Sequence, residues 1–396
     1  MRLMLFTDTL GDVNGVSRFI RNMGHESLKA GREMLIATST RFEVPGDACF
    51  YNCKPRFATK MPKYPELDLV IPNKQALIRR AEAFDPDVVH VSTPGSVGKV
   101  GRDFAKKRGI PIAGVYHTDF PAYLEHLFHD EMYGTVTAQY MKYFYKPFKL
   151  ILSRSEQYME SLEKLGFSRS RMAKLEPGIN LHDFDVSHRD EAVWDEYGLP
   201  QGSVKVLYVG RISVEKNLPM LTSIWPAVRE RATAAGVDAR LVIVGGGPYL
   251  EEMKSTLSGH GAVFPGFKHG TELASLYASA DMFVFPSLTD TLGQVVLESQ
   301  ASGIPVIVAD QGGPKEVVDD GVTGLVLPGS KTPAWVDAVS ELVIDHDRRR
   351  TMGASGVSWS KNFSITASFE KFWAAHEALY DPGVAAPAGV DAMAQA

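Results

Sequence analysis

Short apolar runs alternate with longer helical stretches along almost the whole of this 396-residue chain. Each run is continuously apolar, which is typical of parallel strands that are covered by helices on both faces. The runs form two series, Arg2–Phe6, Glu33–Thr38, Asp87–Val91, Pro111–Tyr116 and Lys149–Leu152, then Val204–Val209, Arg240–Val244, Ala262–Pro265, Asp281–Phe285 and Ile304–Val308. This rhythm predicts an α/β protein with doubly wound sheets.

The rhythm breaks once, between about residues 176 and 203, where the sequence is polar and rich in turn residues. We place the connection between two domains near Pro177–Asp185, so that two Rossmann-like domains face a central cleft. The predicted segments are residues 1–180, residues 181–363, a C-terminal helix over 364–381 that packs on a core, and a disordered tail over 382–396. Ligands of such sheets bind beyond the carboxyl ends of the strands, so functional side chains are expected in the loops that follow strands.

Composition narrows the class of function. Hydrophobic residues make up 44% and charged residues 22%, as in ordinary soluble globular chains. A net charge of −5 argues against nucleic acid as a partner. Two cysteines are too few for a disulfide framework or a four-ligand zinc site, and the eleven histidines show no metal-ligand spacing. With no signal peptide or membrane span in the sequence, we expect a cytoplasmic protein without a bound metal.

The most informative segment covers residues 286–318, which should form a loop, a helix and then a strand. Asp290 lies in the loop, and Glu298 lies about two turns into the helix. Loop amides and a helix N-terminus at this edge offer donors to a phosphate, and Glu298 is suited to accept hydrogen bonds from sugar hydroxyls. Two acids at this spacing, taken alone, are more often a solvated pair.

The surrounding residues resemble the EX7E signature of retaining GT-B glycosyltransferases of family 4. The matching residues are Pro286, Ser287, Gly293, Glu298, Ala301, Gly303, Pro305 and Val306. Asp290 stands where the family usually has Glu, and Leu292 stands where it usually has Phe. The resemblance implies that Asp290 is catalytic and that Leu292, Gly293 and Glu298 bind the donor. The shorter Asp keeps the charge but withdraws it by one methylene.

Three further segments resemble donor-binding parts of the same family. VGRISVEK implies that Arg211 and Lys216 neutralise the charge that develops on a departing diphosphate. PGFK implies that Phe267 shapes the pocket of the nucleotide base. Asn-Gly after the first strand is similar to the family's glycine-rich loop, so the Gly15 amide is expected near the donor phosphate. We read the GGGP turn at residues 245–248 as structural.

HTDFPAYLEHL, after the strand that ends at Tyr116, resembles the branch of the family that glycosylates lipids. This branch includes diacylglycerol glycosyltransferases, sulfoquinovosyltransferases and phosphatidylinositol mannosyltransferases. The resemblance implies that His117 lies beside the transferred sugar as a catalytic-site residue. It also implies that Asp119, Tyr123 and His126 face the acceptor. An isolated histidine after a strand is more often structural.

The resemblance as a whole implies transfer of a hexose from a UDP- or GDP-sugar to a hydroxyl of a lipid or glycan acceptor. Retention of configuration by front-face attack, with no cofactor and no metal, is the expected course. Two alternatives remain. One is a GT-B enzyme with a small soluble acceptor or with epimerase chemistry. The other is a non-catalytic nucleotide-sugar binder, suggested by Asp290 and Leu292 at positions that are usually stricter.

A basic stretch, Lys54–Lys63, bears on membrane contact. It holds four cations and no acid, with Phe57 and Met61 interleaved. Such stretches dock on anionic lipid, so peripheral contact with the inner face of a membrane is one expectation. A solvated loop explains the same residues equally well.

Overall fold

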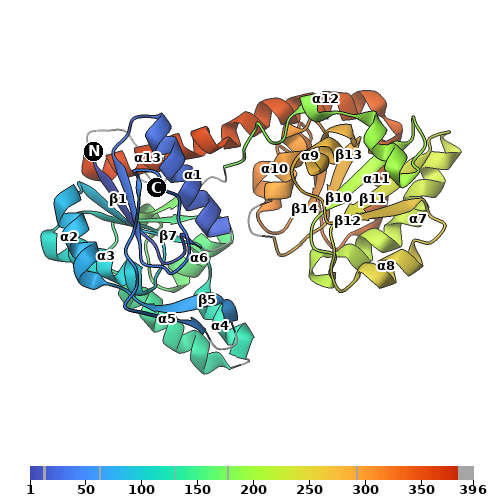
Figure 1. The fold of residues 1–396 in the computed structure, drawn as a ribbon. Coiled ribbons are helices and arrows are strands. Elements are labelled where there is room, and N and C mark those ends of the chain that lie inside the picture. Colours follow the sequence, from blue (N-terminus) through green and yellow to red (C-terminus); the bar gives the residue numbers. More distant parts are fainter. Residues whose placement is uncertain (12–14, 62–63, 129, 176–177, 291–292, 382–396) are drawn as a thin grey trace. The chain divides into compact units, whose positions relative to one another are not determined.

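The chain folds into two compact units (Figure 1). The computed structural model describes residues 1–11, 15–61, 64–128, 130–175, 178–290 and 293–381. Unit 1 comprises Met1–Gly178 and the chain from Ile365 onward, and unit 2 comprises Ile179–Ser364. The chain therefore passes from one unit to the other twice, after Gly178 and after Ser364. The tail over 382–396, predicted to be disordered, lies outside the described residues.

Unit 1 is built on a seven-stranded parallel sheet with the strand order β3-β2-β1-β6-β7-β8-β9. Its strands are β1 (Leu3–Phe6), β2 (Met34–Thr38), β3 (Phe50–Asn52), β6 (Val88–Val91), β7 (Ile112–Tyr116), β8 (Leu150–Ser153) and β9 (Met172–Lys174). Its helices are α1 (Gly15–Lys29), α2 (Lys74–Phe84), α3 (Ser96–Arg108), α4 (Phe120–Phe128), α5 (Glu131–Tyr145), α6 (Glu156–Lys164) and α13 (Ile365–Tyr380). Strand order reverses between β1 and β6, where such sheets bind ligands.

Unit 2 repeats this plan with six parallel strands in the order β12-β11-β10-β13-β14-β15. They are β10 (Val204–Val209), β11 (Ala239–Val244), β12 (Ala262–Gly266), β13 (Met282–Phe285), β14 (Val306–Ala309) and β15 (Gly324–Leu327). The helices are α7 (Leu218–Ala234), α8 (Leu250–Thr256), α9 (Gly270–Ser279), α10 (Gln294–Ala301), α11 (Thr332–Ile344) and α12 (His346–Ser360). Its order reverses between β10 and β13.

All ten predicted strands are confirmed, with ends displaced by two residues at most. The prediction missed the short strands β3, β9 and β15 at sheet edges, because three or four residues give too little pattern. It also missed an antiparallel hairpin of β4 (Phe57–Met61) and β5 (Tyr64–Ile71). Part of the basic stretch, for which a solvated loop was one of two readings, therefore forms strand β4. Polar residues in both strands of this hairpin hide the alternation that marks a strand.

The sheet of unit 1 has a core on each face. Leu3 and Leu5 of β1 pack on one face, and Met4 and Phe6 pack on the other, as the pleat requires. The first face is covered by α1 and by the final helix α13. Phe369, Phe372 and Trp373 of α13 are each almost fully buried in this core. The aromatic residues near the C-terminus are therefore part of the core of unit 1.

A pair of buried histidines joins α13 to the centre of this sheet. The Nδ1 atom of His90 on β6 lies 2.8 Å from Nε2 of His376, and Nδ1 of His376 lies 2.6 Å from the carbonyl of Phe372. Because a carbonyl only accepts, His376 carries its proton on Nδ1, and His90 donates to the other ring nitrogen. Burial lowers the pKa of both rings, that of His376 to about 4, and neighbouring histidines lower that of His90 further.

This pair predicts that the protein loses stability in mild acid. Below the ordinary histidine pKa of 6.5, the unfolded chain binds protons that the folded pair does not. The free energy of unfolding should therefore fall by up to about 1.4 kcal/mol per pH unit for each ring, from about pH 6.5 toward about pH 4. Thermal midpoints between about pH 7.5 and about pH 5 should fall less steeply in His376→Gln than in the wild type. His346→Gln, at an exposed position, should keep the wild-type slope, and equal slopes in all three proteins would contradict the prediction.

Candidate active site

Asp290 ties together three loops at the carboxyl edge of the unit 2 sheet. Its carboxylate accepts a hydrogen bond from Nζ of Lys216 at 2.9 Å and one from the amide of Gly293 at 3.2 Å. Its carbonyl accepts the amide of Gly313 at 2.8 Å. The loops after β10, β13 and β14 therefore meet at one residue. The structure thus brings together Lys216, Asp290 and Gly293, which the sequence assigned to one site, and Leu292 lies outside the described residues.

The backbone at the start of α10 requires glycine. Gly293 caps this helix with a φ of +66°, a left-handed conformation that L side chains rarely adopt. A Cβ atom at this position would lie 2.8 Å from Cα of Pro314. The loop after β13 is therefore held close to the segment that follows β14, with the amide of Gly293 turned toward Asp290.

Glu298 lies on α10, the helix that Gly293 caps, and is almost fully buried. Its two carboxylate oxygens accept hydrogen bonds from Tyr277 Oη and from Gln294 Nε2, each at 3.1 Å. Burial and the charge of Glu298 raise the pKa of Tyr277, which keeps the phenol protonated as a donor. The sequence analysis missed both partners, although Gln294 precedes Glu298 by one helical turn. A role for Glu298 in holding sugar hydroxyls stays a prediction.

Arg211 and Phe267 lie on neighbouring loops at the same edge. Arg211 directly follows the Gly210 turn after β10 and is exposed. The Ile212 amide in this loop donates to the carbonyl of Gly246 at 3.0 Å, which joins it to the glycine turn after β11. Phe267 follows β12 and is 72% exposed, with its ring packed over Gly246. This edge therefore carries an exposed aromatic ring, the cations Arg211 and Lys216 and the acid Asp290.

His117 follows β7 at the carboxyl edge of the unit 1 sheet. Its Nε2 atom lies 3.1 Å from Oγ of Ser92, which follows β6. Its Nδ1 atom is buried and has no hydrogen-bond partner among the described residues. Burial, and then the charge of Arg154, lower the pKa of His117 well below its ordinary value, so the ring is neutral. An unsatisfied buried nitrogen at a ligand-binding edge is a candidate ligand contact.

The other residues assigned to unit 1 lie near this edge. Asp119 accepts a hydrogen bond from the phenol of the buried Tyr116 at 3.1 Å. Tyr123 lies on α4 and is partly exposed. Gly15 begins α1, and a Cβ there would meet no other atom. His126 also belongs to α4, but its side chain lies outside the described residues.

Asp8, which the sequence analysis did not single out, fills the start of α3. Its carboxylate accepts hydrogen bonds from the hydroxyl of Thr93 at 2.7 Å and from the amides of Val97 at 2.8 Å and Gly98 at 3.2 Å. Burial raises its pKa, while these donors oppose the shift. The protein's own carboxylate therefore occupies the anion-binding end of this helix. Two features of the sequence could have indicated this contact. Asp8 lies in the loop after the first strand, and the loop TPGSVG after a neighbouring strand offers hydroxyl and amide donors.

An apolar pocket of about 450 Å³ opens beside Asp8 in unit 1. At one end it reaches the polar loop residues Asp8, Thr93 and Ser96. The remaining walls come largely from the β4–β5 hairpin and the helices α4 and α5. They include Leu69, Val70, Phe120, Leu124, Val136 and Tyr140. The pocket thus joins the polar edge of the sheet to an apolar wall.

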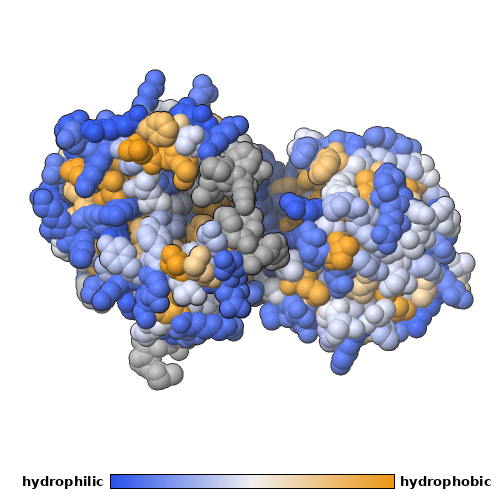
Figure 2. All heavy atoms as spheres, turned by 90° about the horizontal axis from the view of Figure 1, so that it is seen from below, coloured by the Kyte–Doolittle hydropathy of each residue, from blue (hydrophilic) through white to orange (hydrophobic). Residues whose placement is uncertain are grey.

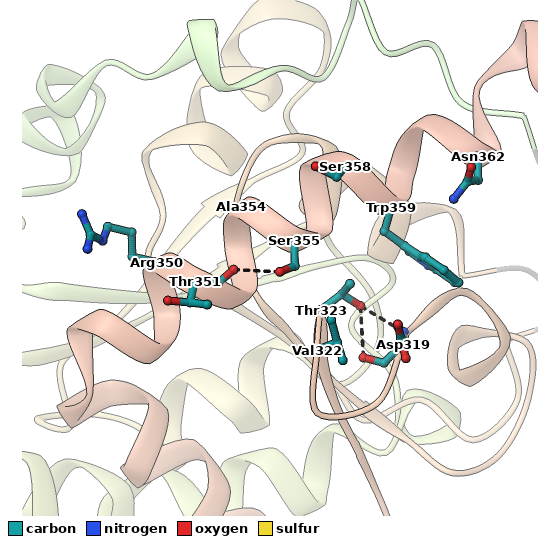
Figure 3. A pocket seen from close by; sticks show the side chains of 10 residues that line it. All are labelled: Asp319, Val322, Thr323, Arg350, Thr351, Ala354, Ser355, Ser358, Trp359 and Asn362. Carbon is teal, nitrogen blue, oxygen red and sulfur yellow. Dashed lines mark hydrogen bonds between the residues drawn. The ribbon is translucent and has the colours of Figure 1, made fainter.

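A larger hollow of about 850 Å³ in unit 2 lies away from this chemistry (Figure 3). It is bordered by α12 and by the turn before β15, at the amino edge of the sheet. The hydroxyl of Ser355 donates to the carbonyl of Thr351 at 3.0 Å, and that of Thr323 accepts the Asp319 amide at 3.0 Å. These polar groups are thus bonded within their own segments, and the hollow is separate from the Asp290 site.

Two family descriptions match the chain, Glycosyltransferase Family 4 over residues 13–183 and Glycosyl transferases group 1 over residues 203–345. A GDP-mannose-dependent alpha-mannosyltransferase of Mycobacterium tuberculosis is 34% identical over 349 residues, which cover 86% of this chain and 87% of the relative. The chain is a glycosyltransferase of family 4. The family assignment drawn from the EX7E-like segment is confirmed.

Two further comparisons bear on this glycosyltransferase. A GDP-mannose-dependent alpha-(1-6)-phosphatidylinositol monomannoside mannosyltransferase of Mycobacterium tuberculosis is 38% identical over 216 residues, 49% of this chain and 54% of the relative. The sucrose-phosphate synthase tll1590 from Thermosynechococcus elongatus superposes with a TM-score of 0.71 at 19% identity, over 96% of this chain and 99% of the other. The likeness in structure confirms the GT-B fold that the sequence predicted.

The close packing of the glycine turn after β11 against the loop after β10 can be tested by substitution. A Cβ at Gly245, whose φ is +130°, would lie 2.0 Å from the carbonyl oxygen of Gly210. Gly245→Ala should lower the free energy of unfolding of unit 2 by about 3 kcal/mol or more, because backbone must move to relieve the overlap. Gly236→Ala is the matched control, with a φ of +77° and open space around it, and should cost about 1 kcal/mol. Urea unfolding followed by tryptophan fluorescence measures both, and equal losses would refute the packing argument.

Proposed function

We propose that this glycosyltransferase moves a hexose from a UDP- or GDP-sugar to a hydroxyl of a lipid acceptor, with retention of configuration. Unit 2 would hold the nucleotide diphosphate. The observation that supports this most is the fixed position of Lys216, whose ammonium is held by Asp290 at the edge where Arg211 and Phe267 also lie. A point charge, a guanidinium fork and an exposed aromatic ring suit a diphosphate and a base.

The proposed reaction makes one bond and breaks one bond at the anomeric carbon. The acceptor oxygen attacks from the face that the nucleotide diphosphate leaves, and the departing phosphate oxygen takes the acceptor proton. Arg211, Lys216 and the Gly293 amide would stabilise the negative charge that develops on the leaving group. In this proposal the side chains supply the charge without a metal ion.

His117 is suited to position the sugar. Its ring is neutral, so one nitrogen donates a hydrogen bond and the other accepts one. Ser92 uses Nε2, and Nδ1 is the buried atom that lacks a partner in the described part of the chain. A sugar hydroxyl can satisfy it, because a hydroxyl both donates and accepts. In this proposal His117 holds the donor sugar and does not remove a proton.

Unit 1 would take the acceptor in the pocket beside Asp8. Its polar end lies at the loops after β1 and β6, and its apolar walls are supplied by the hairpin and by α4 and α5. A molecule with a hydroxylated head and an apolar tail matches this change of polarity. The name of the phosphatidylinositol monomannoside mannosyltransferase relative, which covers half of the chain, supports a lipid acceptor.

The outer face of the same region is suited to a membrane surface. Apolar side chains that are each more than half exposed gather there, namely Phe57, Ile71, Met132, Val136 and Tyr143. Figure 2 looks onto this end of unit 1 and shows apolar groups at its surface. Lys54, Arg56 and Lys60 are exposed nearby on the hairpin. Among the described residues, no helix is long and apolar enough to cross a bilayer. Exposed apolar groups and exposed cations in one region favour peripheral contact with anionic lipid.

The donor site is tested by Lys216→Ala. Turnover should fall by about 100-fold or more, because a charge that stabilises the leaving group is removed. In the same variant the rise in thermal midpoint caused by UDP or GDP should shrink, with and without EDTA. Lys254→Ala is the matched control, since Lys254 forms a 2.9 Å ion pair with Glu251 on α8, outside the loops of the site. Wild-type turnover in Lys216→Ala would rule out the proposed role.

The acceptor side is tested by Val136→Asp, which places a carboxylate at the junction of the pocket and the exposed apolar face. Flotation with vesicles of anionic lipid and transfer to a lipid acceptor should each fall about ten-fold or more. The response of the thermal midpoint to UDP and GDP should stay unchanged. Val322→Asp, at an exposed valine of unit 2, controls for the added charge. The lipid-acceptor proposal fails if the two variants behave alike.

A further inference from the structure

A partly buried cation, Arg154, lies next to His117 and takes no part in the chemistry described so far. Arg154 directly follows β8, at the same edge of the unit 1 sheet as His117. Its guanidinium carbon lies 5.2 Å from the centre of the Phe19 ring, and that ring meets the His117 imidazole edge to face, with ring centres 6.4 Å apart. The guanidinium and the imidazole therefore border one aromatic ring.

Among the described residues, Arg102 and Arg349 are almost fully buried, and oxygen atoms neutralise or cap both of them. Arg102 donates to the carboxylate of Asp103 at 2.8 Å and to the phenol of Tyr143 at 3.0 Å. Arg349 donates to two carbonyls at the end of α11, each at 2.6 Å. Within the described part of the chain, no carboxylate or carbonyl accepts a hydrogen bond from Arg154. A partly buried guanidinium without an oxygen acceptor is unfavourable for stability. An arginine in this state is therefore a candidate for binding a ligand that supplies the acceptor.

Among the described residues, the groups that shift the pKa of Arg154 are a phenol and a second cation, and they include no carboxylate. Burial lowers its pKa to about 10, Tyr158 opposes that shift, and the second cation, Arg18 on α1, adds to it. Arg154 is therefore still charged at neutral pH. Two arginines and the unpartnered Nδ1 of His117 thus gather at the carboxyl edge of the sheet, where a ligand is expected.

We propose that Arg154, with the imidazole of His117 beside it, binds an oxyanion of a substrate. A guanidinium fork matches the oxygens of a carboxylate, sulfonate or phosphate, and a nearby ring nitrogen provides one further hydrogen bond. The proposal deepens the proposed function, on which it rests, because it makes Arg154 a residue that selects an anionic substrate. The anion belongs to the donor diphosphate, to an acidic group on the transferred sugar or to the acceptor, and the chemistry at Arg154 is the same for all three.

The first experiment uses inorganic phosphate and Arg154→Met. At constant ionic strength, phosphate should raise the thermal midpoint of the wild type, and this rise should be largely lost in the variant. Without phosphate, the midpoint of Arg154→Met should equal or exceed that of the wild type, because a partly buried charge without an acidic partner among the described residues is gone. Arg154→Lys keeps the charge without the fork and should recover part of the rise. Arg79→Met removes an exposed arginine of α2 and should respond as the wild type does.

Titrations of the wild type and of Arg154→Met with nucleotides determine which substrate group carries the anion. Equal weakening of UDP, UDP-glucose and UDP-glucuronate in Arg154→Met, by about 10-fold or more, would assign Arg154 to the diphosphate. Weakening of UDP-glucuronate alone would assign it to an acidic sugar. A lost phosphate response with unchanged nucleotide binding would assign it to the acceptor.

The proposal is overturned if Arg154→Met keeps the full phosphate response, or if it lowers the midpoint in the absence of phosphate, as a purely structural cation would. Failure of the proposed function would give a different result. In that case Lys216→Ala would leave nucleotide binding unchanged, whatever Arg154→Met does.

Discussion

Parallel pairing within each large sheet is the constraint on which the rest of the structure depends. Because all neighbouring strands of a sheet run the same way, every loop that follows a strand reaches the same edge. Asp290 and Lys216 are 74 residues apart in sequence, yet their charged groups form a 2.9 Å ion pair. His117 and Ser92 meet at the corresponding edge of unit 1. Helices on both faces leave these edges as the places where polar groups and ligands can meet.

The chemistry at the two edges differs in how charge is balanced. The side chains of Lys216 and Asp290 are 20% and 26% exposed, and an ion pair that contacts water contributes little to stability. The ion pair instead fixes the position of the Lys216 ammonium before a ligand binds. At the unit 1 edge Asp8 is surrounded by donors, whereas no acid in the described part of the chain balances Arg154. One edge thus carries a cation held by a neighbouring acid, and the other carries a cation that lacks such an acid.

Much of the fold and part of the site could be read from the sequence, for physical reasons. Continuous apolar runs mark strands buried on both faces, and loop residues next to them are placed by the sheet direction, as for Lys216 and Asp290. What escaped prediction depends on contacts between distant segments. The partnership of Tyr277 with Glu298 leaves no local pattern, and neither does the packing of the β4–β5 hairpin beside α5. Arg154 was not assigned to the site either, because its packing beside Phe19 leaves no pattern in the sequence.

The position of helix α13 in the core of unit 1 affects the order in which the chain folds during synthesis. Phe369, Phe372 and Trp373 complete a core that begins at Leu3, so unit 1 lacks one wall of its core until the whole of unit 2 has been synthesised. Unit 2 is continuous and can close earlier. Until α13 docks, the apolar face formed by β1 and α1 stays uncovered, which exposes the nascent chain to aggregation and to chaperones. The core of unit 1 can therefore close only after unit 2 and α13 have been synthesised.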